Sequence, residues 1–295
     1  MEQIIVHVGN VVLPILICVF AGFALAKLDL PFDNKMVGAL VSNIGYPTLI
    51  LSHLAAQHVQ VGPFLHMLLA ALLLVLAFGV VSYVFLRLLG LPIRGFLSPM
   101  MLINVGNVGL PVCSLALGNA GLAYGLAFVV VVLAGVFTIG IWIPQGKVSA
   151  SDLYRKPVIY AVIIAVALMA TDTKLPRTLD SAFSILGGLA IPLMLLTLGH
   201  TLATLKVGTL WRGVYIAVFH LCMGMAVAYG IVHLFGFTGV ERGVVILMAV
   251  MPVSVATYLW VERYAPEVAP DVAGYILVST LLTAVALPPI LAFWV

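Results

Sequence analysis

A charge-free apolar stretch constrains the fold of this chain more than any other feature. Between Gly95 and Gly146 the sequence contains no Asp, Glu, Lys or Arg, and a membrane-spanning helix needs only about 20 apolar residues. The pattern extends over the whole chain, because 64% of its 295 residues are hydrophobic and 8% are charged, whereas a soluble domain carries about 25% charged residues. We therefore predict an all-α integral membrane protein with a single membrane domain.

Within this stretch, the segment Asn104–Pro111 (NVGNVGLP) is a poor continuous helix. A helix interior loses about 1 kcal/mol for Gly and about 3 kcal/mol for Pro, relative to Ala. Pro111 also lacks an N–H and clashes with the carbonyl four residues back, that of Asn107. A break frees backbone polar groups, which survive at membrane depth only inside protein or beside a water-filled cavity. We predict that this break is part of the substrate site.

The apolar runs together predict ten transmembrane helices. A polar connector at residues 144–156 separates five runs in residues 1–143 from five in residues 157–295. The first run is long enough to span a bilayer, so we expect a helix there and not a cleaved signal. The predicted spans are 4–26, 36–56, 64–89, 95–118, 121–143, 157–171, 182–205, 213–235, 243–261 and 272–295.

The positive charges predict the orientation in the membrane. With an outer N-terminus, ten of the thirteen Lys and Arg residues fall in cytoplasmic connectors, and only Lys174, Arg177 and Arg242 fall in outer ones. Cytoplasmic connectors carry the excess of Lys and Arg in membrane proteins. We expect a multi-pass protein of the cell inner (plasma) membrane with both termini outside.

The two halves of the chain resemble each other in the positions of their prolines. Pro47 in the second span corresponds to Pro192 in the seventh, and Pro111 in the fourth to Pro252 in the ninth. Five spans per half is an odd number, so the second half must be inverted in the membrane. Inverted repeats with broken helices at matching positions are typical of secondary transporters, whose site lies near the midplane of the bilayer.

Spans four and nine are predicted to cross at their breaks, which brings the N-termini of two half-helices together. Each N-terminus carries roughly half a positive charge and free N–H groups, which suits a carboxylate anion. Interhelical hydrogen bonding is the alternative role for the asparagines, a bond to the preceding turn for Ser254 and Thr257, and ordinary packing for Tyr46. The candidate substrate-binding residues are Asn104, Asn107, Gly109, Pro111, Pro252, Val253, Ser254, Thr257 and Tyr46.

Other classes of function lack support in the sequence. We expect no enzyme, because there is no Ser–His–Asp arrangement, metal-spaced His/Glu set or phosphate loop. We expect no nucleic-acid partner, because the basic residues are scattered, and no cofactor or metal site. All ten acids lie in connectors or at span ends, so the usual intramembrane carboxylate relay is missing. Sodium held by carbonyls, Asn and Ser, or a proton carried by histidine, stays open.

These features resemble the auxin efflux carrier family, the bacterial relatives of the plant PIN-formed transporters, within the bile acid:sodium symporter-like superfamily. The resemblance covers essentially the whole chain and depends on one motif in span four and one in span nine, with a proline in span ten. The residues that carry it are Asn104-x-x-Asn107-x-Gly109-x-Pro111, Met251-Pro252 through Glu262-Arg263-Tyr264, and Pro288.

The resemblance implies two inverted five-helix repeats, with broken, crossing helices four and nine. It further implies a scaffold domain of helices 1, 2, 6 and 7, a transport domain of helices 3–5 and 8–10, elevator-like motion, export of organic anions and a homodimer in the lipid bilayer. The chain lacks the acid that plant members carry in span three and has no Lys in span two. A plant-like ionic support site is therefore not expected.

Three functions are compatible with these observations. The first is a uniporter, exporter or proton-linked carrier of small organic carboxylates. The second is a sodium-coupled organic-anion symporter of the bile acid type, and the third is a sensor that binds a carboxylate without moving it. A requirement for sodium separates the first two, and flux separates both from the third.

Overall fold

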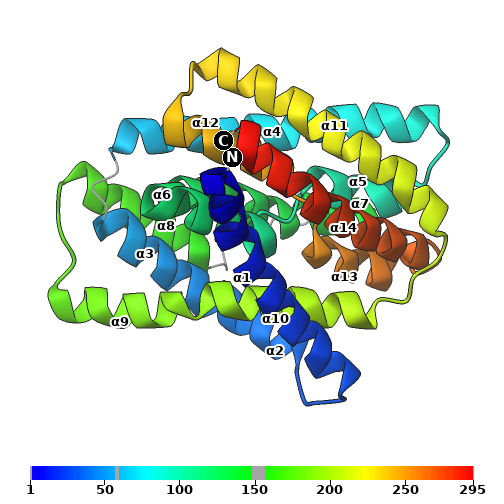
Figure 1. Ribbon diagram of the computed structural model, residues 1–295, viewed down its shortest axis with the longest axis horizontal. Helices are drawn as coiled ribbons and strands as arrows, with labels where there is room; N and C mark the ends of the chain where they lie inside the picture. Colours follow the sequence, from blue (N-terminus) through cyan, green and yellow to red (C-terminus); the bar gives the residue numbers. More distant parts are fainter. Residues whose placement is uncertain (1, 57–59, 148–156, 295) are drawn as a thin grey trace.

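The computed structural model describes residues 2–56, 60–147 and 157–294, and this part of the chain is helical throughout, without a β-strand. It contains fourteen α-helices and two π-helical turns, η1 and η2 (Figure 1). Residues 148–156 of the predicted connector lie outside the described part. The prediction of an all-α protein is confirmed.

Each half of the described chain contains seven α-helices, and the first half also contains both π-helical turns. The first half comprises α1 (Glu2–Lys27), α2 (Asn34–Leu40), η1 (Val41–Gly45), α3 (Tyr46–Ala56), α4 (Val61–Leu88), α5 (Ile93–Met101), η2 (Val105–Gly109), α6 (Leu110–Val136) and α7 (Ile139–Gln145). The second comprises α8 (Pro157–Ala170), α9 (Arg177–Gly188), α10 (Ala190–Thr204), α11 (Leu210–Phe235), α12 (Gly239–Ala249), α13 (Val255–Tyr264) and α14 (Ala269–Phe293).

Seven segments of the described chain are long and apolar enough to cross a membrane, which confirms a multi-pass membrane protein. The number differs from the predicted ten for identifiable reasons. Residues Ile93–Gln145 count as one segment of 53 residues, although Gly118 interrupts its helix with φ 63° and ψ −154°. The apolar helix α8 has 14 residues, α12 has 11 and α13 has 10, so each is too short to count alone.

The helices pack in two groups. In the first helix group, α1 and α2 pack on α10, and α3 packs on α8 and α9. The second helix group contains α4–α7 and α11–α14, in which α11 packs on α4, α12 and α14, and α12 packs on α6. Figure 1 shows α9 and α10 along one side of the molecule and α4, α11 and α12 along the other. The groups meet where η2 lies against α10 and α1 lies against α6 and α14.

Each π-helical turn directly precedes a helix that begins with a proline in its first turn. Leu110 N–H bonds to the Val105 carbonyl, five residues back, just before Pro111, and Tyr46 N–H bonds to the Val41 carbonyl just before Pro47. The wider turn accommodates a ring that would clash with an ordinary α-helical turn. Pro111 therefore does not itself break the helix: the non-helical residues lie earlier, at 102–104.

The two breaks contact each other through their backbones. The first separates α5 from η2, and the second, residues 250–254, separates α12 from α13. The Asn104 N–H donates to the Pro252 carbonyl at 2.8 Å, which joins the breaks directly. The Ser279 hydroxyl of α14 accepts from the Val253 N–H at 3.4 Å. These protein groups thus provide the hydrogen bonds that the broken backbone needs and that hydrocarbon could not provide.

Candidate functional site

A cavity of about 990 Å³ lies where the two breaks meet, and both helix groups line it. The first break and η2 contribute Ile103 to Asn107, and the start of α13 contributes Ser254, Val255 and Ala256. Tyr46 and Met194 face these residues from the first helix group. Four of the nine predicted site residues, Tyr46, Asn104, Asn107 and Ser254, therefore line one cavity.

One polar atom of the Asn104 side chain lies beside this cavity without a hydrogen-bond partner. The residue is the N-cap of η2, and its Oδ1 accepts from the Asn107 N–H at 3.2 Å. Its side chain is only 5% exposed, and its buried Nδ2 has no hydrogen-bond partner within the described residues. A buried donor without an acceptor costs about 1–3 kcal/mol, so a ligand that supplies an acceptor here would gain that energy.

The start of α13 supplies a second set of donors. Ser254 is its N-cap, and no side chain caps the N-terminus of this helix. The first N–H groups of a helix lack intrahelical partners and carry a partial positive charge. Since Val255 and Ala256 line the cavity, their N–H groups lie on its wall, whereas the Ser254 N–H donates to the Pro99 carbonyl at 3.5 Å. The half-buried Asn107 also lines the cavity.

Tyr46 and Gly106 form the contact between the two helix groups next to the cavity. The Tyr46 hydroxyl donates to the Met194 sulfur at 2.8 Å, and Tyr46 is buried. A Cβ atom at position 106 would collide with the Tyr46 hydroxyl oxygen. Only glycine lets η2 approach the first helix group this closely.

Charge is confined to the ends of elements around the cavity. Asp33 and Lys35 lie at the start of α2, Lys206 follows α10, and Glu262 lies in the last turn of α13. The adjoining wall from α6 is apolar, with Val129, Val132, Leu133 and Val136. Among the described lining residues, the crossing itself therefore offers neutral amides and helix ends, and charged groups stand apart from it.

The other five predicted site residues lie behind the cavity wall. A Cβ atom at Gly109 would come within 2.6 Å of the Met248 sulfur, so this glycine permits close packing on α12. The Thr257 hydroxyl donates to the Ser254 carbonyl at 2.9 Å, which is the alternative of a bond to the preceding turn. None of these five residues is among the described residues that line the cavity; they are Gly109, Pro111, Pro252, Val253 and Thr257.

Several lining residues were not identified from the sequence. Ser42 and Asn43 precede the Gly-Tyr-Pro segment of the second span, and a polar pair in an apolar run was a signal for them. Asn34 also lines the cavity, and its Nδ2 lies 3.1 Å from His200 Nδ1. The α6 valines gave no signal, because a lipid-facing valine and a cavity-facing valine look alike in sequence.

The described residues contain no group of three or more His, Cys, Asp or Glu side chains that could hold a metal ion. The donors at the crossing are amides, a hydroxyl and backbone N–H groups, which bind anions by hydrogen bonding. The arrangement can hold a small anion without a metal.

Broken helices that meet at a cavity inside a multi-pass helical protein define a membrane transporter. The comparisons with known proteins agree: the family described as membrane transport protein matches residues 145–295. The chain belongs to this family, that of the auxin efflux carriers. It is also 24% identical over 307 residues to an uncharacterized transporter of Methanocaldococcus jannaschii, with 97% of each chain covered. The resemblance found in the sequence is thereby confirmed.

Proposed function

We propose that this protein is a secondary transporter of small organic carboxylate anions, working as a uniporter or exporter or in a proton-linked way. The observation that carries the proposal is the unpartnered Nδ2 of Asn104 beside the uncapped N-terminus of α13, in one cavity. A carboxylate has the acceptors that both groups need. Hydrogen bonds from uncharged donors hold the anion, and the apolar wall of α6 accommodates the rest of the molecule.

The packing supports a division into two domains. The first helix group corresponds to a scaffold of helices 1, 2, 6 and 7, and the second to a transport domain of helices 3–5 and 8–10 in two inverted repeats. Both breaks belong to the transport domain, whereas Tyr46 belongs to the scaffold. An elevator-like displacement of one group along the other would carry the crossing from one side of the membrane to the other, with scaffold helices forming a homodimer.

Contacts between connectors support the ten-helix topology. The Arg94 guanidinium donates to the Pro144 carbonyl at 2.6 Å, and Arg212 forms a 2.7 Å ion pair with Asp271. The ten-helix arrangement assigns all four residues to the cytoplasmic side. The charged residues at the cavity also belong to that side, so we assign the cavity to an inward-open state.

Substrate binding tests the role of Asn104 directly. Asn104→Ala removes the Nδ2 donor, and hydrogen bonds to charged groups contribute about 1.5–3 kcal/mol, so we expect carboxylate affinity to fall by roughly tenfold to a hundredfold. A thermal-shift screen of mono- and dicarboxylates, with and without sodium, finds the ligand, and calorimetry on the purified variant measures the loss.

Asn43→Ala is the matched control for this experiment. Asn43 lines the same cavity, but its Nδ2 donates to the Ala39 carbonyl in the preceding helix α2 at 2.9 Å. We expect this variant to bind the carboxylate nearly as the wild type does. Equal affinity of wild type and Asn104→Ala would remove Asn104 from the site.

A further inference from the structure

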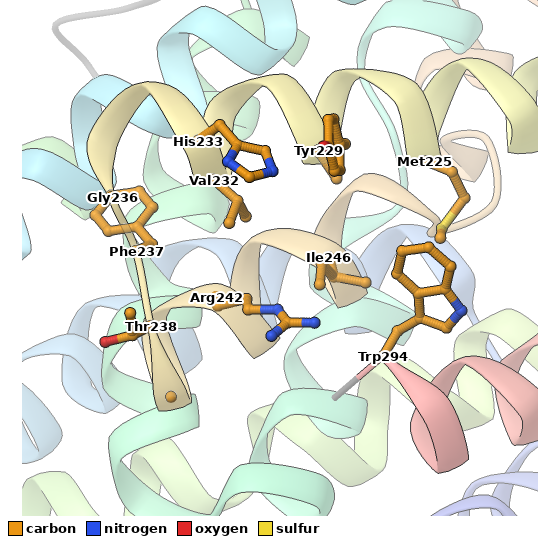
Figure 2. A pocket seen from close by; sticks show the side chains of 12 residues that line it. Met225, Tyr229, Val232, His233, Gly236, Phe237, Thr238, Arg242, Ile246 and Trp294 are labelled. Carbon is orange, nitrogen blue, oxygen red and sulfur yellow. The ribbon is translucent and has the colours of Figure 1, made fainter.

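A second cavity, of about 520 Å³, lies away from the crossing, between α11, α12 and the end of α14 (Figure 2). We call it the Arg242 groove; it is lined by Met225, Ala228, Tyr229, Val232, His233, Gly236, Phe237, Thr238, Gly239, Arg242, Ile246 and Trp294. We propose that this groove binds the phosphate headgroup of an anionic phospholipid, with Arg242 as its principal contact. The inference is independent of the proposed substrate site.

Arg242 gives the groove its charge. It is the one Lys, Arg, Asp or Glu among the described lining residues, and its guanidinium makes no hydrogen bond or ion pair within the described part of the chain. The carboxylate of the neighbouring Glu241 interacts with Tyr124 of α6 instead. A planar guanidinium with free N–H groups matches a phosphate, to which it donates two parallel hydrogen bonds.

Polar side chains of α11 lie opposite Arg242. Figure 2 shows the guanidinium below Tyr229 and His233, with the Trp294 indole at the far end of the groove. The Tyr229 and His233 rings pack edge to face with centroids 4.2 Å apart, which fixes one against the other. Both rings carry groups that hydrogen-bond to oxygen, so they can complete the shell around a headgroup.

The rest of the groove favours a lipid over a free anion. The groove lies at the connector between the membrane helices α11 and α12, and Tyr and Trp concentrate where membrane meets water. Its floor of Met225, Ala228, Val232 and Ile246 is apolar. A lipid can fill this floor with the start of its acyl chains, whereas inorganic phosphate uses only the polar end.

Competition between lipids tests the proposal. The full-length protein in neutral detergent is offered equal amounts of phosphatidylglycerol and phosphatidylcholine, and bound lipid is counted by native mass spectrometry. We expect the wild type to retain phosphatidylglycerol preferentially. Arg242→Gln should lower that retention by about tenfold, the effect of losing one charge-assisted contact.

Arg177→Gln is the matched control, because it removes an equal charge from α9, away from the groove. It should retain phosphatidylglycerol like the wild type. Equal retention by Arg242→Gln and the wild type, or equal losses from both arginine variants, would overturn the proposal.

Two further measurements identify the source of the phosphate. Val232→Trp fills the apolar floor and leaves Arg242 in place, so it should also lose phosphatidylglycerol. Inorganic phosphate in large molar excess should not displace the lipid from the wild type. Retention by Val232→Trp, or displacement by inorganic phosphate, would show a plain anion site and contradict a lipid site.

Discussion

Gly106 lies at a close contact between the two helix groups beside the cavity. Its missing side chain leaves room for the Tyr46 hydroxyl, which in turn reaches the Met194 sulfur. Under the proposed elevator-like motion, such a contact would need to exclude water and still allow the two helix groups to slide past each other. Glycine against an aromatic side chain provides both.

We predict that Gly106→Ala destabilises the protein by about 1–3 kcal/mol, the usual result of overpacking. The added methyl group collides with the Tyr46 hydroxyl, so Tyr46→Phe should recover part of the loss in the double variant. Thermal unfolding in detergent measures both effects. Gly230→Ala serves as the control, because its Cβ would meet no atom within 4 Å and alanine favours a helix. Additive losses in the double variant would exclude this contact as the cause.

At the scale of elements, α1 and α10 pack through small residues. A Cβ on Gly199 would collide with the Val19 carbonyl and lie 2.8 Å from the Phe23 nitrogen, and one on Gly22 would lie 2.7 Å from the Leu196 carbonyl carbon. Backbones can approach this closely in a membrane only where side chains are small.

Gly199→Ala should therefore separate α1 from α10 and cost at least about 1–3 kcal/mol, since rigid backbone cannot move aside as a side chain can. Gly9→Ala on α1 should have little effect, because open space surrounds that position. The unfolding temperatures of the two variants give the comparison. Similar temperatures would mean that the α1–α10 contact is not as close as described.

The positions of the long helices were easier to predict from the sequence than the positions of the two helix breaks. Apolar runs separated by polar connectors placed α4 and α11 to within a few residues of 61–88 and 210–235. Pro111 indicated the first break but not its position, because a π-helical turn accommodates the proline ring and moves the break to residues 102–104. Pro252, which lies inside the second break, marked that one directly.

The residues that line the cavity also differ in how far the local sequence identifies them. Asn104, Asn107 and Ser254 were identifiable because polar residues at predicted helix breaks are conspicuous in an apolar sequence. Pro252 proved to be a support, whose carbonyl accepts from Asn104. The apolar wall from α6 depends on how distant helices pack, which no local pattern records.

At the scale of the whole molecule, the number of membrane crossings decides the topology. An even number, such as ten, puts both termini on one side, whereas seven crossings would separate them. We predict that green fluorescent protein fused to either terminus stays dark, because the ten-span topology with an outer N-terminus would put both ends outside the cytoplasm. An insertion after Lys147 should fluoresce, since the connector there is assigned to the cytoplasm. A fluorescent fusion at one terminus alone would contradict ten spans.

Flux through the reconstituted protein tests the central claim most directly. In proteoliposomes, counterflow of a radiolabelled carboxylate chosen by the binding screen should occur with the wild type and with Asn43→Ala, and should fall at least about tenfold with Asn104→Ala at subsaturating substrate. We expect it to proceed without a sodium gradient. A strict need for sodium would favour the sodium-coupled symporter, and binding without any flux would indicate a sensor; either result would contradict the proposed carrier.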